Sequence, residues 1–318
     1  MTVHYTEDIL KDGFEQAQFD QNDDYEGKVV TTLIRKRHKN DTKKAVLYVH
    51  GFNDYFFHTE LANEFLKNGF HFYALDLRKY GRSLLGHQKS NNVRDLAEYF
   101  ADIDKALEII QYENNSEVVL AGHSTGGLVV TLYASVRPNS DRFKVIYCNS
   151  PFFDMNLPNY QRKYLVPFVA SLGKKFPDWP VVGGFSEFYG KSLHKEYFGE
   201  WNYNLKWKPN KVKAVYAGWI SAIVSGHSTI KSGITIDKPI LIMHAGKSVY
   251  SKKWDSEIQR GDVILNVKHI KDNAQRIKGP RVDVVEIEGG IHDLFLSSVE
   301  VRRVVYLELF QWLEVQFD

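Results

Sequence analysis

The stretch Gly122-His123-Ser124-Thr125-Gly126 decides the fold of this chain. A short apolar run at 117–121 precedes it and predicts a buried strand. Apolar residues then recur at helical spacing, at Leu128, Val129, Leu132 and Tyr133. The pattern G-x-S-x-G between a strand and a helix is typical of a nucleophile elbow, a sharp turn that raises a serine hydroxyl above a sheet. We therefore expect Ser124 to be a nucleophile; a glycine-rich turn that only packs closely is the alternative.

Strand and helix patterns alternate on both sides of this stretch. The expected strands are 28–37 (an edge strand), 45–49, 70–75, 117–121, 144–149, 239–244 and 282–287, and the expected helices include 61–66, 96–110 and 299–315. Such alternation predicts an α/β fold with a mostly parallel central sheet and helices on both faces, because right-handed crossovers carry the chain over the sheet. The polar, acidic residues before 28 predict an irregular lead-in.

The alternation stops after Ser150 and resumes at Pro239. Between them, residues 151–230 hold 17 aromatic residues, a higher share than the 14% of the whole chain. We therefore predict a core in two parts, 1–150 and 237–318, with a cap inserted at 151–236. The aromatic side chains either fix this cap to the core or line an apolar pocket over Ser124. The uncharged run 214–230 is either a buried cap helix or a face for an acyl chain or a lipid surface.

A serine hydroxyl needs a general base, and His292 is the candidate. It follows the last expected strand after Gly289-Gly290, as the chain order serine, acid, histidine requires. His50 and His123 lie inside turn motifs, which excludes them, and a surface histidine is the alternative reading of His292. Asp293 is next to His292, and we expect it to make local hydrogen bonds.

Three aspartates compete for the role of the acid. The strand at 240–244 ends in Ala245-Gly246-Lys247-Ser248, so a serine stands where a Gly-x-x-Asp pattern would place the carboxylate. After an insertion at 250–260, Asp262 opens a helical register, and we choose it because it falls between Ser124 and His292 in the chain. Asp255 in the insertion and Asp154 after an earlier strand remain alternatives.

Two backbone N–H groups should stabilise the oxyanion of acyl transfer. One belongs to Thr125, directly after the nucleophile, where the dipole of the following helix assists. The other belongs to Phe52, in the loop after the strand at 45–49. The sequence therefore predicts an oxyanion hole made by main-chain donors on both sides of Ser124.

These residues belong to five motifs, namely His50-Gly51, Asp76-x-Arg78-x-x-Gly81-x-Ser83, Gly122-His123-Ser124-Thr125-Gly126-Gly127, Ser150-Pro151 and Gly290-x-His292. Over residues 25–318 the set resembles the α/β-hydrolase superfamily, in the branch of monoacylglycerol lipases, lysophospholipases and serine aminopeptidase-like hydrolases. Two departures from that branch are Lys79, which replaces the glycine after Arg78, and the rearranged acid loop.

The resemblance implies a carboxylic ester hydrolase that forms an acyl-enzyme. The expected partner is a small lipid-like ester with an acyl chain, such as a monoacylglycerol or a lysophospholipid, with peripheral lipid contact through the cap. The alternative is an aminopeptidase or amidase, which would need carboxylates such as Glu187, Glu196 or Glu200 near a substrate amino group. A catalytically silent binding relative is disfavoured because both Ser124 and His292 are present.

Composition excludes several classes of protein. The net charge of +2 and the lack of a dense basic run argue against nucleic acid as a partner. No group of His, Cys and Asp has the spacing of metal ligands, so neither a metal nor a cofactor is expected. Cys148 reads as a small core residue. The first 30 residues carry acids and no apolar segment, and no uncharged run reaches the roughly 20 residues of a membrane span, which predicts a cytoplasmic enzyme.

Overall fold

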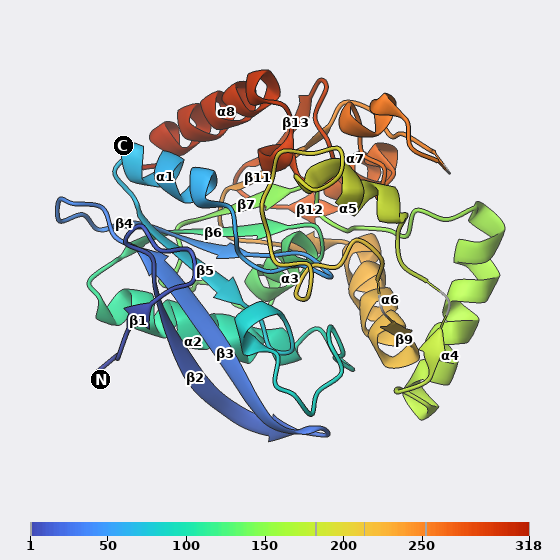
Figure 1. Ribbon diagram of the computed structural model, residues 1–318. Coiled ribbons are helices and arrows are strands. Elements are labelled where there is room, and N and C mark those ends of the chain that lie inside the picture. The colour runs from blue at the N-terminus through green and yellow to red at the C-terminus, as the bar shows by residue number, and fades with distance from the viewer. Residues whose placement is uncertain (1, 182, 213, 252, 318) are drawn as a thin grey trace.

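A nine-stranded sheet forms the centre of the protein (Figure 1). The computed structural model describes residues 2–181, 183–212, 214–251 and 253–317. The strand order is β1-β2-β3-β5-β4-β6-β7-β11-β13, and the sheet is parallel from β5 to β13. The strands are β1 (Thr6–Glu7), β2 (Glu15–Asp24), β3 (Gly27–Lys36), β4 (Lys44–Val49), β5 (His71–Asp76), β6 (Glu117–His123), β7 (Val145–Asn149), β11 (Ile240–Ala245) and β13 (Val282–Ile287).

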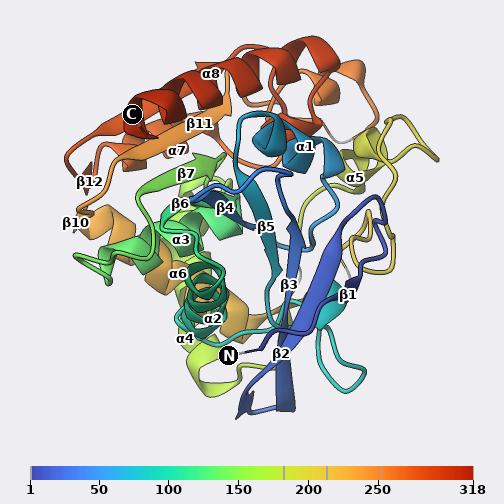
Figure 2. The ribbon, with the colours of Figure 1, turned by 90° about the vertical axis from the view of Figure 1, so that its left-hand side faces the viewer.

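Helices cover both faces of this sheet. They are α1 (Thr59–Lys67), α2 (Glu98–Tyr112), α3 (Thr125–Ser135), α4 (Val166–Lys175), α5 (Glu187–Leu193), α6 (Ala217–Ser232), α7 (Val267–Ala274) and α8 (Val299–Phe317). Figure 2 shows α1 and α8 along one face and α2 and α3 on the other. β4 contributes side chains to both faces of the sheet, because successive side chains of a strand point to opposite faces. Ala45, Leu47 and Val49 pack with α2 and α3, whereas Val46 and Tyr48 pack with α1 and α8.

The predicted α/β architecture is confirmed, with one correction at the N-terminus. The chain before residue 28 forms β1 and β2, where an irregular lead-in was expected. β2 pairs antiparallel with β3, so β3 is an interior strand and the expectation of an edge strand was wrong. Only Ala17 of β2 is buried. A strand of mostly polar residues with a single buried side chain has little apolar alternation, and this is why the sequence pattern did not reveal it.

The segment between β7 and β11 adds no strand to the nine-stranded sheet within its described residues. It holds α4, α5 and α6 with a two-stranded pair, β8 (Pro180–Val181) and β9 (Val215–Tyr216). The uncharged run 214–230 forms most of α6, and its apolar side is buried, including Trp219, Ile223 and Ile230. A Cβ on Gly226 would lie 2.8 Å from the side chain of Leu96, so α6 packs closely on the core.

Two further short strands, β10 (Ile234–Thr235) and β12 (Ile277–Lys278), pair beside the main sheet. Of the helices that the structure describes, none combines the length and the apolar character that crossing a membrane would require.

Candidate active site

Ser124 lies in the tight turn between β6 and α3. Its backbone has φ 52° and ψ −115°, a strained conformation for a residue with a side chain. Glycines make the turn possible. A Cβ on Gly126 would lie 2.4 Å from the carbonyl oxygens of Val49 and His50, and a Cβ on Gly122 would lie 2.5 Å from the carbonyl oxygen of Gly126. The glycines of G-x-S-x-G are therefore required by close approach of the backbone, as in a nucleophile elbow.

The loop after β13 brings His292 to the serine. Its Nε2 lies 3.0 Å from Ser124 Oγ, and its Nδ1 lies 2.8 Å from Asp262 Oδ2. All three side chains are buried. The second oxygen of Asp262 accepts hydrogen bonds from the backbone N–H groups of Ile264 and Leu265, at 2.8 and 2.7 Å. These bonds fix the carboxylate so that it can accept the Nδ1 proton of His292, which leaves Nε2 facing the serine hydroxyl.

The other candidate aspartates have other partners. Asp154 forms ion pairs with Arg162 and Lys231, at 2.5 and 2.8 Å. Burial raises the pKa of the Asp154 carboxyl, but the hydrogen bond and charge of Lys231 outweigh it and hold the pKa below its ordinary value. Asp255 accepts a hydrogen bond from the backbone of Glu257 and so begins a short 3₁₀ turn. Of the three aspartates, Asp262 is the one that the structure brings to His292.

The insertion that displaces the acid rests against the segment that follows α5. Trp254 stacks on Phe198 with ring centroids 3.8 Å apart. The side-chain amide of Gln259 donates to the carbonyl oxygens of Ser192 and Phe198, at 3.1 and 3.0 Å. The described part of the insertion thus connects the loop of Asp262 with residues between β7 and β11.

Ser124 opens into a cavity of about 300 Å³. Its wall is mostly apolar and comes largely from the segment between β7 and β11. The lining includes Phe52, Phe152, Met155, Leu157, Leu165, Val166, Val169, Val181, Phe185, Val215, Trp219, Ile220, Ile264 and Leu265. The polar lining residues away from the serine and His292 are few and include Asp54, Asn156, Gln161 and Lys208. A largely apolar chain with a small polar group suits such a wall.

The predicted oxyanion donors lie on this cavity. A Cβ on Gly51 would lie 3.1 Å from the Cβ of Ser124, so the loop after β4 runs directly against the serine. Phe52 and Thr125 both line the cavity. Among the hydrogen bonds of the described residues, none uses the backbone N–H of Phe52 or of Thr125. Both donors are thus free for an oxygen in the cavity.

A buried polar cluster next to the site was missed by the sequence analysis. It consists of Asp54 and His58 in the loop after β4, His123 at the end of β6, and Asp293 in the loop after β13. Burial lowers the pKa of the imidazoles of His58 and His123 below the ordinary value of histidine. The sequence offered no signal for this cluster, because its members are widely separated along the chain. Asp293 Oδ1 accepts a local hydrogen bond from the backbone N–H of Phe295 at 3.2 Å, and it also accepts from the side-chain amide of the distant Asn149 at 2.8 Å.

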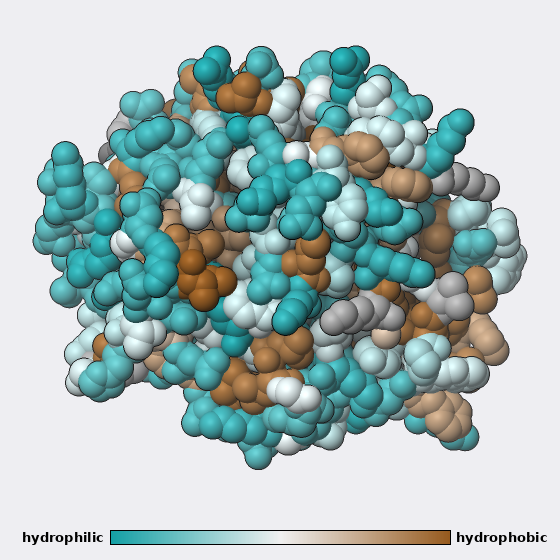
Figure 3. Space-filling view, viewed as in Figure 1, coloured by the Kyte–Doolittle hydropathy of each residue, from teal (hydrophilic) through white to brown (hydrophobic). Residues whose placement is uncertain are grey.

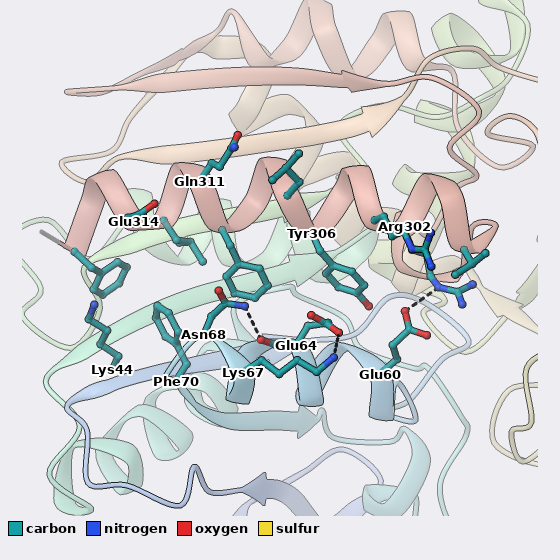
Figure 4. A pocket seen from close by; sticks show the side chains of 16 residues that line it. Lys44, Glu60, Glu64, Lys67, Asn68, Phe70, Arg302, Tyr306, Gln311 and Glu314 are labelled. Carbon is teal, nitrogen blue, oxygen red and sulfur yellow. Dashed lines mark hydrogen bonds and ion pairs between the residues drawn. The ribbon is translucent and has the colours of Figure 1, made fainter.

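A second hollow of about 890 Å³ lies between α1 and α8 (Figure 4). Its walls carry ion pairs, including Lys67 with Glu64 and Arg302 with Glu60. No predicted site residue lines it. This groove is therefore separate from the site of Ser124.

Comparison with known proteins agrees with this architecture. A curated relative, the AB hydrolase superfamily protein YisY of Bacillus subtilis (strain 168), is 25% identical over 226 residues, which cover 69% of this chain and 80% of the relative. Two similar solved structures are a soluble variant of monoglyceride lipase from Saccharomyces cerevisiae and a monoacylglycerol lipase from Paleococcus ferrophilus. Their TM-scores are 0.69 and 0.65, at 19% and 17% identity. The alignments cover 95% of this chain in both cases, and 96% and 99% of the lipases.

At these identities the two structures show the shared fold. Residues 40–298 match the sequence profile of the family described as serine aminopeptidase, S33, which is most of the chain. The chain therefore belongs to the serine aminopeptidase S33 family of α/β-hydrolases.

Proposed function

We propose that this hydrolase cleaves carboxylic esters of a lipid-like kind, such as a monoacylglycerol or a lysophospholipid, with Ser124, His292 and Asp262 as its catalytic triad. The observation that carries the proposal is the contact of Ser124 Oγ with His292 Nε2, at 3.0 Å, at the base of an apolar cavity. A hydrogen-bonded serine and imidazole, with the imidazole held by a carboxylate, is the arrangement that activates a hydroxyl for attack on a carbonyl carbon.

In the first half of the reaction, Ser124 Oγ attacks the ester carbonyl and His292 Nε2 takes the hydroxyl proton. Asp262 holds the imidazole in place and stabilises its positive charge. The imidazolium then gives the proton to the leaving alcohol, and an acyl-enzyme remains on Ser124. In the second half, water loses a proton to His292 and attacks the acyl carbon, which releases the carboxylic acid and restores the serine hydroxyl.

Negative charge develops on the carbonyl oxygen during both attacks. We assign its stabilisation to the backbone N–H groups of Phe52 and Thr125, both of which line the cavity. The loss of one such donor costs about 2.7 to 4 kcal/mol in a comparable enzyme. Because both donors are main-chain groups, substitution of the Phe52 side chain would leave the donor in place.

The cavity supports an acyl chain as the larger part of the substrate. Residues 151–236 act in this proposal as a cap, since α4 and α6 supply much of the apolar wall. The neighbouring surface is apolar as well. Tyr164, Leu165 and Phe168 expose half or more of their area, and Figure 3 shows apolar side chains at the edge where α4 lies in Figure 1. Peripheral contact with a lipid surface would deliver the substrate here. The two lipases named above share this fold.

The aminopeptidase alternative needs an acidic group for a substrate amino group. Among the described residues, Glu187, Glu196 and Glu200 do not line the cavity. Glu187 pairs with Lys191, and Glu200 pairs with Arg302. Among the described residues that line the cavity, the one carboxylate is that of Asp54, and it is already paired with Lys208 at 2.8 Å. This arrangement favours an ester with an apolar acyl group.

The test is hydrolysis of p-nitrophenyl esters of increasing chain length and of a monoacylglycerol, beside an aminoacyl p-nitroanilide. The variants are Ser124→Ala and Asp262→Asn, with Asp255→Asn as the matched control, because it makes the same isosteric change in an exposed carboxylate of the same loop. We expect activity to peak at medium or long chains. Asp262→Asn should lower kcat by a factor on the order of 10⁴, and Asp255→Asn should leave it near wild type.

Activity on the anilide alone would replace this proposal with the aminopeptidase. If Ser124→Ala were as active as the wild type, Ser124 would not be the nucleophile and the proposed triad would be wrong. A normal Asp262→Asn would return the role of the acid to Asp154, which Asp154→Asn would then test.

A further inference from the structure

Four polar side chains lie close together in the buried polar cluster next to the triad. His58 Nε2 lies 3.5 Å from Asp293 Oδ2. His123 Nδ1 lies 3.8 Å from the same oxygen and 3.9 Å from Asp54 Oδ2. The ligand atoms of Asp54, His58 and Asp293 all lie within 4.8 Å of one another. The four side chains are at most 3% exposed, and Asp54 and His123 also line the cavity of Ser124.

None of these atoms has a hydrogen-bond partner among the described residues. Both ring nitrogens of His58 and of His123 are unpartnered, and so are Asp54 Oδ2 and Asp293 Oδ2. A buried polar atom without a partner costs about 1 to 3 kcal/mol, and more if it is charged. Four of these atoms, namely His58 Nε2, His123 Nδ1, Asp54 Oδ2 and Asp293 Oδ2, lie near one another, and an occupant that satisfies several of them at once would remove this cost.

The spacing of these atoms distinguishes two kinds of occupant. Four ligands at about 2.0–2.1 Å from a zinc ion, placed tetrahedrally, are about 3.3 Å apart. Four hydrogen-bond partners of a water molecule, at about 2.8 Å, are about 4.6 Å apart. The separations of 3.5, 3.8 and 3.9 Å are closer to the first value, whereas the ligand atoms of Asp54, His58 and Asp293 as a set lie within 4.8 Å of one another. Binding of an ion would therefore draw these side chains together.

The negative charge of the cluster also favours a bound cation. Asp54 and Asp293 carry two negative charges in a buried position. Within the described residues, Lys208 is the one lysine or arginine paired with either carboxylate, and its Nζ lies 2.8 Å from Asp54 Oδ1. Asp293 Oδ1 is held by neutral donors, the amide of Asn149 and the backbone of Phe295. One negative charge thus lacks a cation, and burying an unpaired charge is costly.

We infer that Asp54, His58, His123 and Asp293 bind one divalent cation of the zinc class. Two imidazole nitrogens and two carboxylate oxygens are a ligand set suited to Zn²⁺, and the imidazoles disfavour Mg²⁺ and Ca²⁺, which prefer oxygen. Lys208 and Asn149 hold the outer oxygens of the two carboxylates and so orient the inner oxygens toward the ion.

The ion joins loops that the triad also uses. His123 and Asp293 directly precede Ser124 and follow His292, and Asp54 lies two residues after Phe52. The ion therefore connects the loops after β4 and β13 with the end of β6, close to the proposed catalytic groups. It acts as a structural tie and touches no reacting atom, so this inference stands independently of the proposed ester hydrolysis.

The test is the metal content and metal affinity of the full chain without an affinity tag. Metal is measured by mass spectrometry on the purified protein. It is then removed with a chelator, and Zn²⁺, Mg²⁺ and Ca²⁺ are added back under calorimetry and thermal unfolding. The variant is His58→Phe, because the imidazole already packs on the ring of Phe57, with centroids 4.3 Å apart, and a phenyl ring fits there. The control is His244→Phe, another buried histidine with an unpartnered Nε2, outside the cluster.

We expect about one equivalent of Zn²⁺ in the wild type and in His244→Phe, and at least a 100-fold weaker affinity in His58→Phe. Zn²⁺ should raise the Tm of the first two proteins by several degrees, because it binds only the folded state, and Mg²⁺ and Ca²⁺ should not. Two results would overturn the inference. One is a wild type that neither retains Zn²⁺ nor gains stability from it. The other is equal Zn²⁺ affinity in wild type and His58→Phe, since binding would then lie elsewhere.

Discussion

Ser248 lies beside Asp262, on two parallel stretches of chain joined by a β-bridge. The backbone N–H of Asp262 donates to the carbonyl oxygen of Lys247 at 2.9 Å, and that of Val249 donates to the carbonyl oxygen of Asp262 at 2.8 Å. Ser248 Oγ accepts from the backbone N–H of Val267 at 2.9 Å and donates to the carbonyl oxygen of Leu265 at 3.2 Å. Ser248 stands where an aspartate was expected. Its two hydrogen bonds thus fix the backbone of the segment that follows Asp262.

Replacement of Ser248 by alanine tests this support. Loss of two hydrogen bonds should let the loop of Asp262 shift against His292, and a misplacement of about 1 Å can cost on the order of 100-fold in rate. We expect Ser248→Ala to lower kcat by roughly 10- to 100-fold with little change in KM, as measured by steady-state ester hydrolysis. Ser251→Ala, an exposed serine of the same loop, is the control. Unchanged kcat in Ser248→Ala would show that the loop of Asp262 keeps its position without these two hydrogen bonds.

Substitution of Gly126 by alanine should prevent the elbow from forming. The new Cβ would lie 2.4 Å from two backbone oxygens, and backbone atoms cannot move aside as a side chain can. We expect a loss of more than about 4 kcal/mol in the free energy of unfolding, or no folded protein at all. Thermal unfolding and yield are the measurements. Gly86→Ala, where a Cβ meets nothing within 4 Å, should behave as wild type; equal behaviour of the two variants would contradict the argument.

The departure at Lys79 is explained by an ion-pair network. Lys79 has φ 64°, a conformation that favours glycine, yet its buried ammonium lies 2.7 Å from Asp24 and 2.8 Å from Glu26. Lys79→Gly relieves strain of about 1 to 2 kcal/mol but leaves two buried carboxylates without this cation, at a cost of about 3 to 5 kcal/mol. We expect the free energy of unfolding, measured with urea, to decrease by about 2 kcal/mol in Lys79→Gly.

The control for this prediction is Asn139→Gly. Asn139 has φ 62° and is exposed, so the change relieves similar strain without breaking an ion pair. It should be neutral or slightly stabilising. A Lys79→Gly variant at least as stable as the wild type would mean that the ion pairs contribute nothing.

The stability of the protein should fall in mild acid partly through His227 of α6. Its Nε2 donates to the carbonyl oxygen of Phe152 at 2.8 Å, and burial lowers its pKa to about 4 from an ordinary value of 6.5. Between these values the unfolded chain binds more protons than the folded protein, so the free energy of unfolding decreases as the pH falls from about 6.5 toward 4. Above pH 6.5 this contribution is fully present.

His227→Gln keeps a donor for Phe152 and removes the titration. From pH 7 to pH 5 the free energy of unfolding of the wild type should decrease by roughly 2 kcal/mol more than that of this variant. The difference amounts to about 1.36 kcal/mol per pH unit below 6.5. Urea unfolding at the two pH values measures the difference. His4→Gln, at an exposed histidine, should keep the decrease of the wild type. An equal decrease in His227→Gln and in the wild type would assign the acid sensitivity to other groups.

The sequence was sufficient wherever a local pattern reports a local structure. The apolar run at 117–121 and the glycines around Ser124 predicted the strand, turn and helix that the structure has, because the period of side-chain burial and the need for small residues act within a few positions. The same reasoning placed the parallel strands and α8. It failed for β2, whose residues are mostly polar and include a single buried side chain, so that no apolar period is visible.

Contacts between distant segments were decided only by the tertiary structure. Chain order allowed Asp154, Asp255 or Asp262 as the acid, and the approach of Asp262 Oδ2 to His292 Nδ1 depends on how an inserted loop packs against Phe198. The cluster of Asp54, His58, His123 and Asp293 is likewise assembled from two loops and the end of β6. Such contacts depend on the packing of whole elements, which no local spacing encodes. The sequence by itself determined the fold and the turn that carries Ser124, and tertiary packing determined which charged groups surround this serine.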